Sequence, residues 1–249
     1  MARTNRLLQI IAVSLFLGFT SMAEAGWIMV EQEGDTSIIS NGKLKSSAEG
    51  VTWILDGPDN KMVFIDSNQK SYASGTVEDY CSATTSLVDE AMKGLNAEQR
   101  KVLEEMMQQG QNDAGHKVTV TAAGDGGSVA GLKTTKYRVQ VDGQLYKDIW
   151  LATNPGLVHE FKPLIPLLQK FSACANTFGT EFMPENSAEY LRLMERGVEV
   201  KSVIYTDNSP EPVTEMIKME NKALPATDFS IPPNYRQMSF EQMLKSQME

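Results

Sequence analysis

Cysteine, histidine and long apolar segments are scarce in this sequence, and each scarcity excludes a class of function. The chain of 249 residues has two cysteines and two histidines, His116 and His159, without the ligand spacing of zinc sites or metalloproteases. No C-x-x-C pair is present, which argues against a redox enzyme. No segment after residue 25 is apolar enough to cross a membrane. We therefore expect no metal, no cofactor and no stable membrane insertion.

Positive charge is also scarce. The 23 lysines and arginines face 32 aspartates and glutamates, which gives a net charge of −9 at pH 7. A negative surface repels phosphate backbones, so we expect no nucleic-acid partner. No cluster of basic residues offers an anionic membrane the attraction that a peripheral protein needs.

Catalytic motifs are missing as well. Residues 126–130 (GGSVA) imitate a nucleophile elbow around Ser128, but that motif needs a strand before the serine and a helix after it. Residues 132–135 have the pattern of a strand, which places Ser128 in a hairpin loop. The pair His159-Glu160 is interpreted as exposed and ahead of a helix. We expect the protein not to be an enzyme.

The N-terminus has the three parts of a secretory signal peptide. Arg3 and Arg6 supply the positive start, residues 7–19 are apolar, and Ala23-Glu24-Ala25 is a small-x-small cleavage signal. We expect cleavage after Ala25 and export to the periplasm. An uncleaved membrane anchor is the alternative, but about 13 apolar residues are too few to span a bilayer. No cysteine near the cleavage site is available to carry a lipid.

Cys81 and Cys174 are the two cysteines, and export would place them in an oxidising compartment. We predict that they form a disulfide, which would close a long loop and stabilise the fold by about 4 kcal/mol in the chain-entropy model. The alternative is a pair of buried free thiols.

The first half of the chain has strand patterns followed by helical patterns. Residues 27–72 are typical of an antiparallel meander, with Asn41-Gly42 as the turn between residues 36–40 and 43–47. Residues 77–109 predict two helices. Their apolar faces are Leu87, Ala91 and Met92 in the first, and Val102, Leu103, Met106 and Met107 in the second. Asn96 and Gln99 form a capping pair before the second helix.

In the second half of the chain, strand patterns are again followed by helical patterns. Strands are predicted at residues 116–122, 132–141 and 144–153, with turns at 124–127 and at Asp142-Gly143. A broadly apolar helix follows at residues 163–175, and another at 187–196 with Asn186 as its cap. Strands at 198–206 and 213–221 and an extended tail through residues 231–233 complete the chain.

This order of elements predicts one α+β domain over residues 26–249. No βαβ rhythm, internal repeat or low-complexity linker is present. We therefore expect a curved antiparallel sheet, an open half-barrel, with helices packed in its concave face. The disulfide would then join two of those helices.

Several segments resemble a family of bacterial exported domains of unknown function (DUF4412-like). They are residues 130–137 (AGLKTTKY), 142–143 (DG), 149–151 (IWL), 197–201 (GVEVK) and 231–235 (IPPNY). That family in turn resembles the lipoprotein-carrier (LolA/LolB-like) superfamily, whose members fold as an unclosed β-barrel around helices and hold acyl chains. The resemblance implies the fold and suggests a hydrophobic ligand. The carriers' residues for handing on lipoproteins have no counterpart here, so transport is not implied.

Two functions remain open. In the first, a soluble periplasmic protein binds a lipid or another hydrophobic ligand in the half-barrel cavity, by apolar burial against the concave face. The residues expected on that face are Trp53, Phe64, Tyr137, Val139 and Trp150. In the second, these residues pack the protein's own helix at 163–175, and the protein is an envelope adaptor that binds a protein partner by a sheet edge or its acidic surface.

Overall fold

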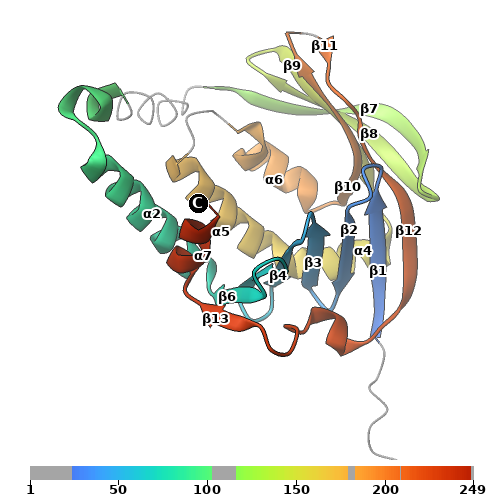
Figure 1. Cartoon of the computed structure of the whole chain (residues 1–249). Helices are drawn as coiled ribbons and strands as arrows, with labels where there is room; N and C mark the ends of the chain where they lie inside the picture. The colour runs from blue at the N-terminus through green and yellow to red at the C-terminus, as the bar shows by residue number, and fades with distance from the viewer. Residues whose placement is uncertain (1–23, 103–115, 179–182, 208, 248–249) are drawn as a thin grey trace, which may run out of the picture.

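The computed structural model describes residues 24–102, 116–178, 183–207 and 209–247. Within these residues, 13 strands form one large open sheet, and a few helices pack against it (Figure 1). The mixed architecture with an unclosed sheet agrees with the class predicted from the sequence. The predicted leader lies in residues 1–23, outside the described part, apart from its last two residues.

The N-terminal part forms an antiparallel meander, as predicted. Its strands are β1 (Glu24–Glu31), β2 (Thr36–Ser40), β3 (Lys43–Ala48), β4 (Val51–Asp56), β5 (Lys61–Asp66) and β6 (Ser71–Gly75). Asn41 and Gly42 have φ values of 53° and 68°, the left-handed conformation that a two-residue hairpin turn requires. β1 begins at Glu24, so cleavage after Ala25 would remove the first two residues of this strand.

Helix α2 (Val77–Gly94) follows β6 and is fixed at its start by a capping box. The Thr76 hydroxyl accepts the Asp79 N–H at 3.1 Å, and the Asp79 carboxylate accepts the Thr76 N–H at 2.8 Å. The capping pair of Asn96 and Gln99 is confirmed, because each side chain accepts the other's backbone N–H. Most of the predicted second helix, including Leu103, Met106 and Met107, lies outside the described residues.

Three long strands follow: β7 (Val118–Val129), β8 (Leu132–Val141) and β9 (Gln144–Ala152). The turn predicted at residues 124–127 is wrong. Register shifts show two bulges there, and the glycines supply the positive φ that a bulge needs without reversing the chain. The chain reverses at Ala130-Gly131 instead. Ser128 therefore lies in β7 opposite Lys133, not in a hairpin loop.

The helical segment of the second half begins earlier than predicted. It consists of α4 (Pro155–Phe161), η2 (Lys162–Leu164), α5 (Ile165–Phe178), η3 (Pro184–Asn186) and α6 (Ala188–Met194). Asn154 caps α4, so His159 and Glu160 lie within a helix and not ahead of one. Ser187, not Asn186, caps α6, because its hydroxyl accepts the Tyr190 N–H at 3.2 Å. No helix of the described residues has the length and apolar character needed to cross a bilayer.

The C-terminal part holds the two strands predicted from the sequence and four elements that were not predicted. Its elements are β10 (Val198–Thr206), β11 (Ser209–Pro210), β12 (Thr214–Leu224), η4 (Ala226–Phe229), β13 (Arg236–Met238) and α7 (Phe240–Ser246). The tail is therefore not simply extended. β13 pairs with β6 in parallel, which makes the sheet mixed and not purely antiparallel. A capping box of Ser239 and Gln242 begins α7.

The sheet consists of two parts joined at β12. The strand order is β13-β6-β5-β4-β3-β2-β1-β12-β10-β9-β8-β7, with β11 paired to β10. Residues 216–224 of β12 pair with β1, whereas the pairs recorded with β10 are Glu215 with Lys201 and Thr214 with Ser202. β12 therefore crosses from one part of the sheet to the other.

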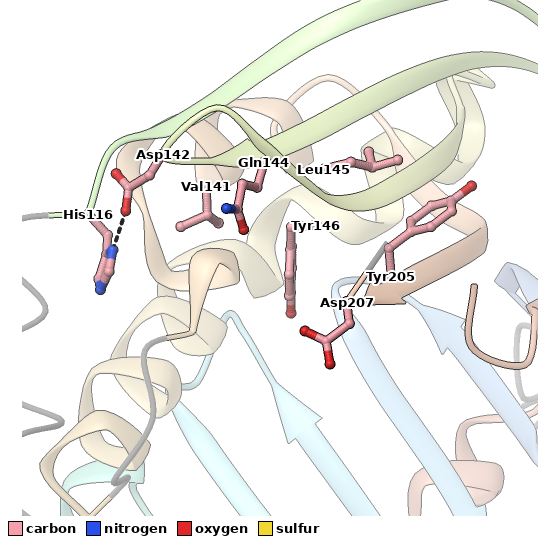
Figure 2. Close-up of a pocket in the computed structure, with 8 residues that line it drawn as sticks. All are labelled: His116, Val141, Asp142, Gln144, Leu145, Tyr146, Tyr205 and Asp207. Carbon is pink, nitrogen blue, oxygen red and sulfur yellow. Dashed lines mark hydrogen bonds and ion pairs between the residues drawn. The ribbon is translucent and has the colours of Figure 1, made fainter. Parts of the chain in front are cut away.

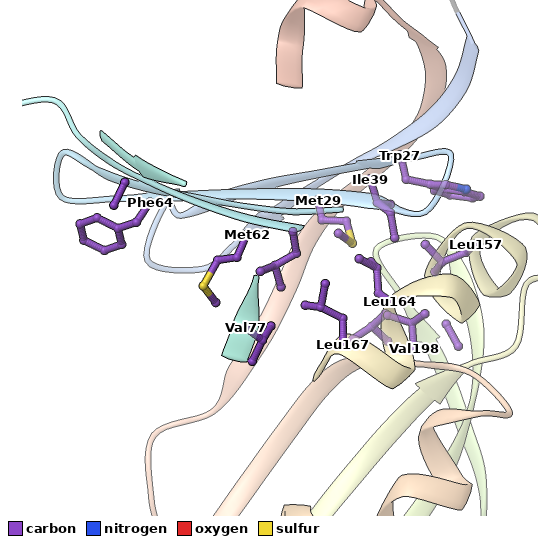
Figure 3. Packing of buried hydrophobic residues seen from close by; sticks show 14 of the residues in the cluster. Trp27, Met29, Ile39, Met62, Phe64, Val77, Leu157, Leu164, Leu167 and Val198 are labelled. Carbon is purple, nitrogen blue, oxygen red and sulfur yellow. The ribbon is translucent and has the colours of Figure 1, made fainter. Parts of the chain in front are cut away.

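The largest core cluster lies between the meander and the helices (Figure 3). Met29, Ile39 and Phe64 of the sheet face Leu164 and Leu167 of the helical segment, and all five side chains are buried. α4 contacts β1, β2 and β3, while α2 contacts α5 and α7. The helices thus cover one face of the meander.

The other face of the meander is covered too. Ile54, Val63 and Ile65 form a separate buried cluster, against which Phe229 and Ile231 of the C-terminal segment pack. A third cluster lies between α6 and the second part of the sheet and includes Val139, Ile149 and Leu193. Burial on both faces explains the uninterrupted apolar runs Trp53–Leu55 in β4 and Met62–Ile65 in β5.

Candidate functional site

A bulge in β9 directs two consecutive side chains to the same carboxylate. Val139 of β8 pairs with Lys147 and Gln140 pairs with Leu145, which leaves Tyr146 without an opposite residue. The Tyr146 hydroxyl donates to both Glu185 oxygens, at 3.0 and 3.1 Å, and the Lys147 ammonium lies 3.4 Å from Glu185 Oε1. Bulges often re-aim side chains in this way beside functional sites.

Lys147 is the centre of a buried polar network. Its side chain is 8% exposed, and its Nζ lies 3.1 Å from Glu199 Oε1 and 3.1 Å from the Tyr190 hydroxyl. The Tyr190 hydroxyl in turn donates to Glu199 Oε2 at 2.6 Å. The network joins β9, β10, η3 and α6. Every polar group in it has a partner, which is the condition for a buried charged cluster to stabilise a fold.

Both tyrosines of the network remain protonated donors. Burial and then the Glu199 carboxylate raise the pKa of Tyr190 above its ordinary value. Burial and then Glu185 raise the pKa of Tyr146 in the same way. Neither phenol is therefore activated as a nucleophile or base. The hydrogen bonds of the two tyrosines hold the neighbouring elements together.

Replacing Lys147 by Met is expected to lower the free energy of unfolding by about 2 kcal/mol, because it leaves two carboxylates beside each other without their cation. The value is below that of a fully buried pair, since Glu185 and Glu199 are 31% and 24% exposed. Urea denaturation followed by circular dichroism measures it. Lys218→Met, which breaks an exposed ion pair with Glu220, is the control and should change stability by less than about 0.5 kcal/mol. Equal effects of the two changes would refute the role of the network.

A second charged cluster centres on Asp148. Its side chain is 1% exposed and lies 2.7 Å from Lys136 Nζ and 3.1 Å from Arg138 Nε, and the Tyr205 hydroxyl donates to it at 3.3 Å. Burial alone would raise the pKa of Asp148, but the hydrogen bonds from Lys136 and Arg138 outweigh burial and hold that pKa below its ordinary value. Asp148 is therefore an anchor for three side chains.

A pocket of about 500 Å³ opens at the end of the β8–β9 hairpin, beside Tyr146 and Tyr205 (Figure 2). Asp142 and Asp207 contribute carboxylates and His116 contributes an imidazole. The Asp142 carboxylate accepts the Lys117 N–H at 2.8 Å and pairs with His116 Nδ1. These two contacts, with the backbone one the larger, lower the pKa of Asp142, so that the pocket retains a negative charge.

Trp53 and Phe64, two of the residues predicted to bind a ligand, lie together in the core. Their ring centroids are 4.2 Å apart in an edge-to-face arrangement. Tyr80 of α2 and Phe171 of α5 lie against Trp53, with centroid distances of 5.8 and 6.3 Å. The protein's own helices therefore contact this pair.

The other three predicted residues belong to strands β8 and β9 of the second part of the sheet. Tyr137 and Val139 belong to the cluster under α6, and Val139 is fully buried. Trp150 pairs with Lys136 in the adjacent register, so it lies on the opposite face of β9 from Ile149, which pairs with Tyr137. Lys136 Nζ and Lys201 Nζ lie 4.6 and 5.3 Å from the Trp150 ring. Trp150 packs against the cluster that contains Trp53 and Phe64, so three of the five predicted side chains share one cluster, and Tyr137 and Val139 belong to another.

The predicted disulfide stays a prediction. Cys81 lies in α2 and Cys174 in α5, and these two helices contact each other. The Cys174 side chain lies outside the described part of the chain. In that described part, no three His, Cys, Asp or Glu side chains are grouped so that they could hold a metal ion.

The alternation pattern of β9 indicates that Lys147 is buried. Lys147 has the same alternation phase as Ile149 and Leu151, both fully buried, so a charge stood at a position predicted to be covered. A covered lysine requires an acidic partner. No spacing rule indicates that the partners are Glu185 and Glu199, because they come from separate elements.

Within the described residues, the fold is a mixed α/β arrangement dominated by a large open sheet of 13 strands with a few helices. Residues 21–235 match the family described as Domain of unknown function (DUF4412), and the chain belongs to this family. The family resemblance inferred from the sequence is thereby confirmed. Among curated proteins no significant match is found.

Proposed function

We propose that the protein is an exported module of the bacterial cell envelope that acts in the periplasm by binding a protein partner. One observation carries the proposal: the aromatic face that a hydrophobic ligand would need is in contact with α2 and α5 of the same chain. Trp53 packs on Tyr80 and Phe171, and Leu164 and Leu167 fill the space beside Met29 and Ile39. Because the protein's own helices cover this face, we place the binding of a partner on the outer surface.

The charge of the chain supports a partner with complementary charge. The net charge is −9, and several acidic groups lie near one another at the β1–β2 turn. Burial, followed by the carboxylates of Asp35 and Glu33, raises the pKa of Glu31. Such a field increases the rate of encounter with a basic partner.

A second candidate is carriage of a lipid in a half-barrel cavity, as in the lipoprotein-carrier superfamily. Trp27 favours it. Its indole N–H is a buried donor for which the described atoms provide no acceptor, and its side chain belongs to the core between the meander and α4. An unpaired buried donor costs about 1–3 kcal/mol, and a ligand carbonyl would remove that cost if α4 and α5 moved off the sheet.

Protein purified from its own periplasm distinguishes the two functions. Native mass spectrometry and solvent extraction should give the mass of the chain alone, with no lipid, and chemical crosslinking in cells should join it to one envelope protein. The same mass reports whether the leader is removed and where. One equivalent of co-purified lipid would support carriage and overturn the adaptor proposal.

A further inference from the structure

We propose that the pocket at the end of the β8–β9 hairpin binds an organic cation, the side-chain ammonium or guanidinium group of a lysine or arginine on the protein partner. This inference rests on the proposed function and names the chemistry of the partner. The pocket combines two tyrosine rings with the carboxylates of Asp207 and of Asp142, which pairs with His116, and none of the residues described as lining it is Lys or Arg. Carboxylates and ring faces together are the groups that recognise organic cations.

Both tyrosine hydroxyls already donate to carboxylates of the protein itself. Tyr146 donates to Glu185, and Tyr205 donates to the buried Asp148. In Figure 2 the Tyr205 hydroxyl points away from Asp207, and Tyr146 and Asp207 both line the pocket. The rings are therefore held in place by Glu185 and by the buried Asp148, and they offer the pocket their apolar and π-electron surface.

The two carboxylates are held at the rim by turns. Asp142 has φ of 51° in the β8–β9 turn and Asp207 has φ of 52° after β10. The lowered pKa of Asp142 keeps it ionised at neutral pH. Behind the Tyr146 ring lie Glu185 and Glu199, two carboxylates that share Lys147 as their described cation. On the side of Tyr205, Asp148 is paired with Lys136 and Arg138, so the negative charge of the pocket comes from its own lining carboxylates.

The positive φ at both aspartates permits a clean test. Asparagine tolerates this conformation and keeps the acceptor oxygen, so Asp142→Asn with Asp207→Asn removes two charges with little change in backbone. The matched control is Asp59→Asn with Asp125→Asn, two exposed carboxylates outside the pocket, one in the β4–β5 turn and one at the bulge of β7. Both double variants have the same net charge.

The mature protein is titrated with Nα-acetyl-arginine amide and, separately, with tetramethylammonium chloride, while amide resonances are followed by NMR. Arginine amide should shift the resonances of residues 142–146 and 205–207 and saturate in the millimolar range, since the pocket is open and the contact is small. The pocket variant should bind at least fivefold more weakly, and the control variant within twofold of wild type.

Absence of saturable binding, or equal weakening in both variants, would overturn the inference. Tighter binding of tetramethylammonium than of arginine amide would assign the pocket to a free quaternary ammonium and overturn its role with a protein. The crosslinked partner gives the separate readout. A partner retained by the pocket variant refutes this site and leaves the proposed function standing, whereas arginine binding without any partner refutes the function and leaves the cation site standing.

Discussion

Replacing Asp148 by Asn is expected to lower the free energy of unfolding by about 3 kcal/mol, the lower end of the range for breaking a buried ion pair. Asp148 is 1% exposed, whereas its cations Lys136 and Arg138 are 27% and 44% exposed and regain water when the charge is lost. Urea denaturation at pH 7 measures the change. Glu220→Gln, which breaks the exposed pair with Lys218, should cost less than about 0.5 kcal/mol.

The same variant makes a prediction about pH. Because the pKa of Asp148 is lowered by folding, its contribution to stability is present above the unfolded value of about 3.9 and is lost as the pH falls through the folded value. The difference in stability between wild type and Asp148→Asn should therefore be constant from pH 7 to about pH 5 and shrink below pH 4. A difference that grows on acidification would contradict the assignment of the ion pairs.

Gly57→Ala is expected to destabilise the protein by about 3 kcal/mol, the upper end for overpacking. A Cβ at Gly57 would lie 2.6 Å from the Pro163 carbonyl carbon and 3.0 Å from the Leu164 nitrogen. These are backbone atoms, so no side chain can rotate away. The substitution would push η2 off the hairpin turn and loosen the helices over the aromatic face. Thermal unfolding and binding of the dye ANS measure the two effects.

Gly94→Ala is the matched control. Gly94 ends α2, and a Cβ there meets no atom within 4 Å. Alanine is the better helix former, so stability should be unchanged or slightly higher. If Gly57→Ala unfolds at the same temperature as Gly94→Ala, the contact with Pro163 does not hold the helices in place.

Short sequence motifs predicted turns and helix starts correctly where each motif is compatible with only one local structure. Asn41-Gly42 between alternating strands indicates a two-residue turn, and the structure has one. The run Gly124-Asp125-Gly126-Gly127 indicates positive φ, but bulges and turns both require it, and the pairing with β8 decides between them. The box of Ser239 and Gln242 was a readable helix start, overlooked because the preceding prolines suggested an extended tail.

The residues of the candidate site could not be predicted from local sequence signals. Tyr146, Glu185 and Glu199 come from a strand, a 3₁₀ turn and another strand, and their sequence spacing carries no regularity. Their meeting depends on the β9 bulge and on how α6 packs, both of which are tertiary outcomes. The aromatic residues were predicted to share one surface on hydrophobicity alone, which does not distinguish a ligand surface from a core.

The strand order has a consequence for how the chain folds. Both sides of the N-terminal meander are completed by the end of the chain, because β1 pairs with β12 and β6 pairs with β13. Glu24 pairs with Leu224 and Ser71 with Arg236, residues 200 and 165 positions apart in the sequence, and such long loops slow folding. The first half therefore cannot reach its native state while the last residues are still being synthesised or translocated. In an exported protein this delay would keep the chain unfolded until it has passed the membrane.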